Sequence, residues 1–457
     1  MEIRLTEGSV PRSVLRFSVP FLLSALLQSL YGMADLYVIG RFGDPSGTTA
    51  VSVGSQVMHV LTVLVMGLAM GTTVTTARAA GARSADRERT ETAGAPASDG
   101  VNRAVGNSAL LFGGISVCLT AVLLCLVRPV VALMSTPETA VPSCAAYLTV
   151  CFAGIPFITA YNLIAAVYRA AGDSVTPLRF VGTACVCNVA LDFLLTGALS
   201  MGTVGVALGT VLSQAVSVGY ALIHTARRGL FRLTREDLTP DRRLIREILR
   251  IGTPVMVQDG LIQVTFIVIT VIANRRGLDD AAAVGIVEKL IGIFFMVPSA
   301  MLAAVSALCS MCLGAGKEER SRRTLRFCVL AALVWGVSVS VLMQFTAERF
   351  VGWFTDSASV ARLGGSYLRG YVWDCALAGV HFCFSGYFSA VGRSELSFIH
   401  NLLSMLFVRI PGAYFGSLLF PDTLFPMGLA STGGSLLSVA VCLLFDRCLR
   451  RKEGRTG

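Results

Sequence analysis

The sequence predicts an all-α polytopic membrane protein built from two similar halves. The chain has 457 residues, of which 54% are hydrophobic and 14% charged, whereas soluble domains usually carry about 25% charged residues. A membrane-spanning helix needs roughly 20 apolar residues. Twelve such stretches follow one another: 14–39, 49–77, 104–127, 140–168, 175–198, 203–226, 247–273, 282–311, 325–346, 359–391, 396–419 and 424–446. The stretches are continuously apolar rather than alternating, which excludes a transmembrane β-barrel.

Short segments of the first half recur in the second half in the same order. Leu15–Pro20 (LRFSVP) matches Leu249–Pro254 (LRIGTP), and Ala170–Ser174 (AAGDS) matches Ala390–Ser394 (AVGRS). Six expected spans precede the connection between the halves, so both halves enter the membrane in the same direction. The two six-helix lobes are therefore expected to be related by a pseudo-two-fold axis along the membrane normal. Such paired halves are typical of secondary transporters, whose binding site lies in the cleft between them.

The expected domain boundaries follow from this repeat. Residues 1–226 form an N-terminal six-helix lobe, and residues 247–457 form a C-terminal six-helix lobe with a short basic tail. Residues 227–246 form a basic cytoplasmic connector that carries a short amphipathic helix. The span 14–39 is too long for the apolar core of a signal peptide and lacks a small-residue cleavage motif after Asp35, so it is expected to remain as the first helix.

The positive charge of the chain indicates its topology. The formal net charge is +10, from 38 Lys and Arg residues against 28 Asp and Glu residues. Of the 38, 29 lie in or beside the termini and the even-numbered connections, 7 lie at the odd-numbered connections, and Lys289 and Arg409 lie within spans. The positive-inside rule therefore places both termini and the connector in the cytoplasm. This distribution favours a lipid bilayer with anionic headgroups as the partner and excludes nucleic acid.

The cysteines and histidines do not indicate an enzyme. Most of the 13 cysteines lie in apolar spans, where a thiol behaves as a small hydrophobic group. Cys309 and Cys312 form a Cys-x-x-Cys motif without a second pair or a nearby histidine, so buried packing is the better interpretation. The sequence contains neither a Gly-x-x-x-x-Gly-Lys-Ser/Thr phosphate loop nor a His/Glu metal motif. We therefore expect no catalytic residue, no metal site and no cofactor.

Polar side chains inside the apolar spans are the candidate functional residues, because an ionisable group at mid-bilayer costs at least about 2.5 kcal/mol. In the first span, Gln28, Tyr31 and Asp35 lie three to four residues apart on one helix face. In the fifth span, Asn188 and Asp192 also share a face. Carboxylates from two spans predict a polar pocket in which a proton and a cation compete for the same oxygen atoms. The alternative is that both aspartates solvate helix ends at the membrane interface.

Two further features of the sequence concern this pocket and its motion. Tyr161 and Asn162 lie within the fourth span and add a phenol and an amide to the polar groups of the first lobe. Pro20 and Pro254 occupy equivalent positions in the first span of each lobe, where a proline removes a backbone hydrogen bond and permits a bend. We interpret the two prolines as candidate hinges, with static kinks as the alternative.

The second lobe has buried ionisable residues of its own. Asp259, Glu288, Asp374 and His381 are the second-lobe candidates. Asp259 has no obvious partner, whereas Arg409 is expected to neutralise either Asp374 or Glu288 as a structural ion pair. His381 follows Asp374 by seven residues on the same helix face, which suggests either a proton relay or a hydrogen-bonded packing residue.

These residues carry a family resemblance. Gln28–Gly40 (QSLYGMADLYVIG) resembles the first-helix signature of the multidrug and toxic compound extrusion (MATE) family. Tyr168–Ser174 (YRAAGDS) resembles its loop after the fourth span, and Asn188–Asp192 (NVALD) resembles its fifth-span motif. Val287–Lys289 and Leu313–Lys317 are similar to its eighth-span region. The resemblance covers essentially the whole chain and is nearest to the bacterial branch with an acidic first lobe.

The resemblance implies a multi-pass antiporter of the bacterial inner (plasma) membrane that exports drugs or metabolites in exchange for protons or sodium by alternating access. It implies Pro20, Asp35, Asn162, Asn188 and Asp192 as functional positions and leaves the second lobe without a matching cation site. Mainly acidic intramembrane charges favour a lipophilic cation as the small-molecule substrate. A lipid-linked saccharide flippase of the same superfamily is the alternative function. The protein is expected to act as a monomer.

Overall fold

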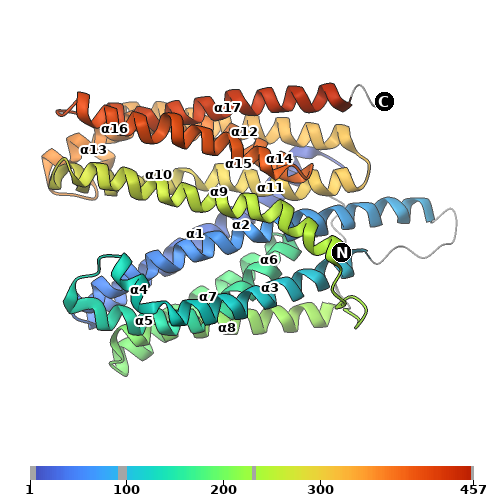
Figure 1. Ribbon diagram of the computed structural model, residues 1–457, viewed down its shortest axis with the longest axis horizontal. Helices are drawn as coiled ribbons and strands as arrows, with labels where there is room; N and C mark the ends of the chain where they lie inside the picture. Colours follow the sequence, from blue (N-terminus) through green and yellow to red (C-terminus); the bar gives the residue numbers. More distant parts are fainter. Residues whose placement is uncertain (1–6, 91–99, 229–232, 454–457) are drawn as a thin grey trace. The chain divides into compact units, whose positions relative to one another are not determined.

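The computed structural model of the protein describes residues 7–90, 100–228 and 233–453. All regular secondary structure within these ranges is helical (Figure 1). The chain divides into two compact units. Among the described residues, the first unit comprises residues 19–249 and the second comprises residues 7–18 and 250–453. The fold-class prediction of an all-α membrane protein is confirmed.

The first unit is built from seven α-helices besides most of α1, together with two short irregular turns. Its elements are α1 (Val10–Phe42), α2 (Pro45–Thr90), α3 (Gly100–Cys125), α4 (Val127–Leu133), the 3₁₀ turn η1 (Glu138–Ala140), α5 (Val141–Ala153), α6 (Ile155–Ala170), α7 (Val175–Asp192), the π-helical η2 (Phe193–Ala198) and α8 (Gly202–Arg228). α2 packs on α5 and α6, and α7 packs along α8. This packing brings the end of α7 against the middle of α8.

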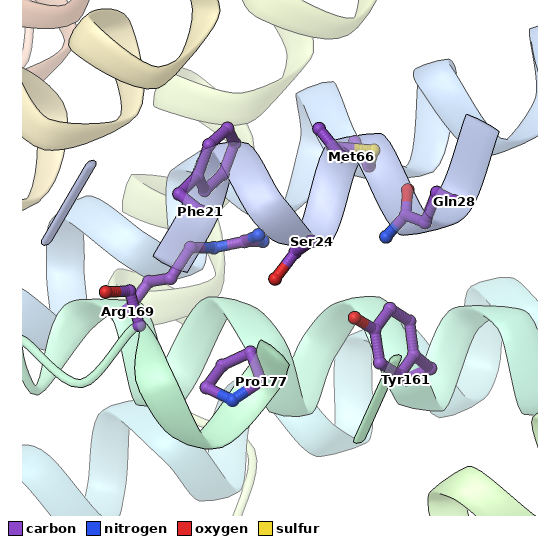
Figure 2. A pocket seen from close by; sticks show the side chains of 9 residues that line it. Phe21, Ser24, Gln28, Met66, Tyr161, Arg169 and Pro177 are labelled. Atoms are coloured by element: carbon purple, nitrogen blue, oxygen red, sulfur yellow. The ribbon is translucent and has the colours of Figure 1, made fainter. Parts of the chain in front are cut away.

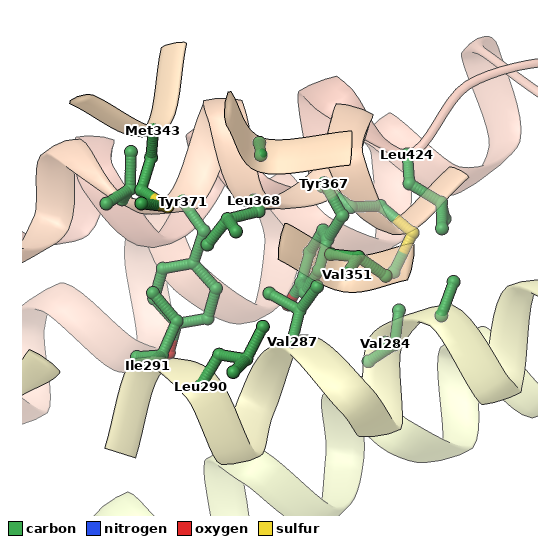
Figure 3. Packing of buried hydrophobic residues seen from close by; sticks show 14 of the residues in the cluster. Val284, Val287, Leu290, Ile291, Met343, Val351, Tyr367, Leu368, Tyr371 and Leu424 are labelled. Carbon is green, nitrogen blue, oxygen red and sulfur yellow. The ribbon is translucent and has the colours of Figure 1, made fainter. Parts of the chain in front are cut away.

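The second unit has a similar order of elements. They are α9 (Arg242–Asn274), α10 (Leu278–Phe294), α11 (Met296–Gly314), α12 (Glu318–Gly352), α13 (Ala358–Tyr371), α14 (Trp373–Ala390), α15 (Ser394–Ser404), the π-helical η3 (Met405–Arg409), α16 (Ile410–Leu419) and α17 (Phe425–Glu453). Its apolar core lies where Val287 and Leu290 of α10 meet Tyr367, Leu368 and Tyr371 of α13 (Figure 3). Each unit thus buries a core of its own.

Ten helical stretches of the described chain are long and apolar enough to cross a membrane, and η1–α5 with α6 make an eleventh that is bent by 47°. The remaining expected span, 359–391, corresponds to α13 and α14, which meet at Val372. Neither helix alone is both long and apolar enough to cross a membrane. The helix α13 has only 14 residues, and polar groups such as Asp374 and His381 lower the hydropathy of α14. The Val372 carbonyl at the junction accepts a hydrogen bond from Ser340 Oγ at 2.9 Å.

The first helix of each half is shared between the units. α1 passes into the first unit at Val19, and α9 passes into the second unit at Arg250. Pro20 and Pro254 lie one and four residues beyond these points, inside unbroken helices. The weakened backbone that a proline creates is therefore located just after each crossing. The hinge role of the two prolines stays a prediction.

The connector 227–246 differs from its expected form. α8 continues to Arg228, residues 229–232 lie outside the described ranges, and residues 233–241 form turns. Within the described part, the expected short amphipathic helix is instead the beginning of α9. The backbone N–H of Asp241 donates to Asn107 Oδ1 of α3 at 2.7 Å, which fixes the start of α9 on the first unit.

Candidate functional site

The first unit brings the two predicted aspartates together. Asp35 of α1 is 3% exposed and Asp192 at the end of α7 is fully buried. The carboxyl of Asp35 faces the side chains of Asp192 and Asn188. Thr210 Oγ1 of α8 lies 3.2 Å from Asp35 Oδ2 and 3.2 Å from the carbonyl oxygen of Val206, so its single proton is shared between two acceptors.

Most polar atoms of this cluster have no hydrogen-bond partner within the described chain. They are Asp35 Oδ1, both side-chain polar atoms of Asn188 and both carboxylate oxygens of Asp192. Buried polar groups are normally paired, and an unpaired charge in a low-dielectric interior is far costlier. Two adjacent carboxylates also repel each other unless a proton or a metal cation lies between them. The cluster therefore has the properties of a site for a small cation, supplied with hard oxygen ligands.

Local structure explains how Asp192 reaches this position. Asn188 and Asp192 stand one turn apart on α7, and the helix then widens into the π-helical η2. Single π-helical turns occur frequently at functional sites. On the facing helix α8, a Cβ atom at Gly209 would overlap Asp192 Oδ1. The missing side chain at position 209 thus provides the space that the Asp192 carboxyl occupies.

The other predicted first-lobe residues divide into two groups. Tyr31 lies close to Asp35 and to Gln214 of α8, and the phenol of Tyr161 lies close to Gln28. These side chains extend the polar cluster along α1. Asn162 is 4% exposed, but its amide donates to the carbonyl of Ile158 on its own helix at 2.9 Å.

A cavity of about 40 Å³ continues this polar strip (Figure 2). It is lined by Phe21, Ser24, Ala25, Gln28, Met66, Tyr161, Arg169, Ser174 and Pro177. From the sequence, Arg169 counts only as a cytoplasmic basic residue, although it belongs to the family-like motif Tyr168–Ser174. Sequence reasoning missed Thr210 and Gln214 of α8, although both are polar residues within the expected span 203–226. Gly209 indicates only close helix packing.

The second unit holds its ionisable residues in a separate, paired network. Arg409 Nη2 donates to both oxygens of Asp374 at 3.2 Å and to Ser435 Oγ at 2.6 Å. Ser435 Oγ also lies 3.1 Å from Nε2 of His381. Of the two partners expected for Arg409, the structure selects Asp374. Because guanidinium and carboxylate neutralise each other, this network differs from the unpaired cluster of the first unit.

Three second-lobe residues complete this picture. Glu288 Oε1 accepts a hydrogen bond from the Tyr367 hydroxyl at 3.1 Å. The rings of His381 and His400 stack edge to face with centroids 5.4 Å apart, and both are buried. Asp259 is half-buried on α9 and forms no ion pair within the described chain. The described residues also contain no group of three or more His, Cys, Asp or Glu side chains suited to a metal ion.

Comparison with known proteins identifies the family. The MatE family model matches two stretches, residues 20–194 and 254–415, one in each half of the chain. The probable multidrug resistance protein YpnP of Bacillus subtilis is 27% identical over 89% of this chain and 88% of its own length. The multidrug export protein MepA of Staphylococcus saprophyticus is 23% identical over 87% of this chain and 85% of its own length.

Solved structures share the fold over the whole length. A MATE crystal structure in complex with MaL6 superposes with a TM-score of 0.89 at 22% identity, covering 100% of this chain and 99% of the other. An outward-facing multidrug resistance MATE transporter of the MOP superfamily superposes with a TM-score of 0.87 at 21% identity, covering 98% and 97%. The twofold match to the family model confirms the resemblance seen in the sequence. The chain belongs to the multidrug and toxic compound extrusion (MATE) family, and it is a membrane transporter rather than an enzyme.

Proposed function

We propose that the protein is a secondary active antiporter that exports lipophilic cationic drugs or metabolites in exchange for protons or sodium by alternating access. The observation that carries this proposal is the cluster of Asp35, Asn188 and Asp192, in which most of the buried oxygen atoms lack hydrogen-bond partners within the described residues. The names of the relatives, which include multidrug export proteins, support small drugs as substrates.

The physical basis of the coupling is competition for one pair of carboxyl groups. When Asp35 and Asp192 hold a proton or Na⁺, their negative charge is compensated and a cationic drug gains little from them. When the coupling ion leaves, the carboxylates attract a lipophilic cation, and aromatic neighbours such as Tyr31 add cation–π contacts of roughly 0.5–2 kcal/mol. Because cellular proton and sodium gradients point inward, this exchange drives the drug outward.

Gradient-driven transport in proteoliposomes tests the proposal. Purified protein is reconstituted, a proton or a sodium gradient is imposed, and ethidium movement is followed by fluorescence. We expect Asp35→Asn and Asp192→Asn each to abolish gradient-driven exchange, because an amide keeps the shape of the carboxyl but neither binds a proton nor holds a cation charge. The gradient that drives the wild type identifies the coupling ion.

Asp44→Asn is the matched control, since Asp44 is exposed between α1 and α2 and its oxygen atoms accept hydrogen bonds from Ser46 and Gly47 at the start of α2. Asparagine caps a helix about as well as aspartate, so this variant should transport normally. Full coupled transport in both Asp35→Asn and Asp192→Asn would exclude the cluster as the coupling site. Movement of a lipid-linked sugar without ethidium transport would favour the flippase instead.

A further inference from the structure

The cavity beside the carboxylate cluster contains a cation that the coupling mechanism does not use. Arg169 lies in the last turn of α6, and its guanidinium forms neither an ion pair nor a hydrogen bond within the described chain. Its guanidinium instead stacks 5.6 Å from the ring centroid of Phe21 on α1. Figure 2 shows the side chain extending from α6 toward α1, with the guanidinium between Phe21 and Ser24. A guanidinium turned into the protein in this way requires an electronegative partner.

The acidic residue nearest to Arg169 in the sequence is not that partner. Asp173 lies four residues further on, but its Oδ1 accepts the backbone N–H groups of Val175 and Thr176 at 3.0 Å, and its Oδ2 accepts the Thr176 hydroxyl at 2.6 Å. Asp173 is therefore committed to the start of α7. No acidic residue among the described ones lines the cavity, so no ion pair within that part of the chain neutralises Arg169.

The other polar side chains that line the cavity can donate hydrogen bonds. Ser174 is 3% exposed, and its Oγ has no partner within the described chain. The Tyr161 hydroxyl and the Gln28 amide reach the cavity from α6 and α1. Phe21, Met66 and Pro177 supply apolar walls. A guanidinium with hydroxyl and amide donors around it is the donor set that binds an oxyanion.

The size of the cavity limits what it holds. A single water needs about 10–15 Å³ of such space, so a cavity of about 40 Å³ has room for roughly three waters. This volume is suited to a carboxylate or a compact phosphate group, but it is too small for a whole drug. The apolar part of the molecule must lie outside it.

We propose that Arg169 and Ser174 form a subsite for the anionic oxygen group of an amphiphilic substrate. The proposal rests on the drug-export function above and assigns the anionic end of a zwitterionic substrate to this cavity. On α1, Gln28 in the cavity and Asp35 in the carboxylate cluster are seven residues apart, which is about 10 Å along a helix. The first unit therefore offers opposite charges to the two ends of one molecule.

A pair of dyes that differ only at the carboxyl tests the subsite. Rhodamine 110 carries a xanthylium cation and a free carboxylate, and rhodamine 123 is its methyl ester. Binding is measured by fluorescence polarisation with the full protein in phosphatidylcholine nanodiscs. We expect Arg169→Gln to weaken rhodamine 110 binding at least about ten-fold and to change rhodamine 123 binding by less than about two-fold. Ser174→Ala should weaken rhodamine 110 binding more modestly, and Arg169→Lys should retain part of it.

Arg179→Gln is the matched control. Arg179 lies on α7, is exposed and does not line the cavity. This variant removes the same charge from the chain, so it should leave the affinity for both dyes unchanged. Equal weakening of both dyes in Arg169→Gln, or unchanged rhodamine 110 affinity, would overturn the subsite.

Lipid composition distinguishes the two sources of the oxyanion. If a headgroup phosphate occupies the subsite, adding phosphatidylglycerol to the nanodiscs will weaken rhodamine 110 binding in the wild type but not in Arg169→Gln. If phosphatidylglycerol does not weaken rhodamine 110 binding, the subsite belongs to a substrate from solution. If the wild type binds rhodamine 110 but not rhodamine 123, the proposed preference for lipophilic cations is contradicted and the subsite is not. If the wild type binds neither dye, both proposals are overturned.

Discussion

Single residues of the first unit determine whether the carboxyl groups can meet. Asp35, Asn188 and Asp192 were predictable from the sequence, because polar residues within apolar spans are rare and must have a reason. Their proximity depends on the packing of α7 along α8 and on the hydrogen bond between Asp35 of α1 and Thr210 of α8, which the sequence does not specify. Gly209 illustrates the difference, since nothing in its surroundings along the chain indicates that a side chain there would overlap Asp192.

Gly209→Ala should therefore impair coupling without touching an ionisable group. A methyl group at this position would displace the Asp192 carboxyl or the backbone of α8, and overpacking of this kind costs about 1–3 kcal/mol. We expect gradient-driven ethidium exchange to fall at least about ten-fold and the thermal unfolding midpoint to decrease.

Gly219→Ala on the same helix is the control, because a Cβ atom there meets nothing within 4 Å. That variant should transport like the wild type and be at least as stable, since alanine is the better helix former. Normal transport and stability in Gly209→Ala would show that the carboxyl does not depend on this space.

At the scale of elements, the sequence predicts helices well and their interruptions poorly. Apolar runs and internal prolines indicate where α1 and α9 lie and where they are weakest. The π-helical η2 after Asp192 and the junction between α13 and α14 at Val372 carry no such mark. At the junction, the Val372 carbonyl accepts a hydrogen bond from Ser340 of α12, a tertiary contact that the sequence does not indicate. Because η2 directly follows Asp192, the sequence fails to predict the helix geometry at a candidate site residue.

At the scale of the whole molecule, the two-half repeat was visible in the sequence and the family model matches once in each half. The halves nevertheless differ in their polar interiors. Asp35 and Asp192 of the first unit form no ion pair within the described chain, whereas Asp374 of the second unit pairs with Arg409. We therefore propose that ion coupling belongs to the first unit and that the Asp374–Arg409 pair has a mainly structural role.

The orientation of the chain is a further prediction at this scale. We propose that both termini and the segment between α8 and α9 face the cytoplasm, because 29 of the 38 basic residues lie on that side. In a background without reactive native thiols, Arg235→Cys should resist an impermeant thiol reagent added to intact cells. Asp422→Cys, exposed between α16 and α17, should react with it. The reverse pattern of labelling would invert the topology.

The central claim is that a proton or sodium ion and a cationic drug compete for Asp35 and Asp192. The most direct measurement is the dissociation constant of ethidium for the purified protein at several pH values and sodium concentrations. Protonation neutralises the pair, so wild-type affinity should weaken at least about ten-fold as pH falls from about 8 to about 5, or as sodium rises, depending on the coupling ion. The Asp35→Asn/Asp192→Asn double variant should bind ethidium weakly and equally under all these conditions. If the ethidium affinity of the double variant depends on pH and sodium as strongly as that of the wild type, the claim is contradicted.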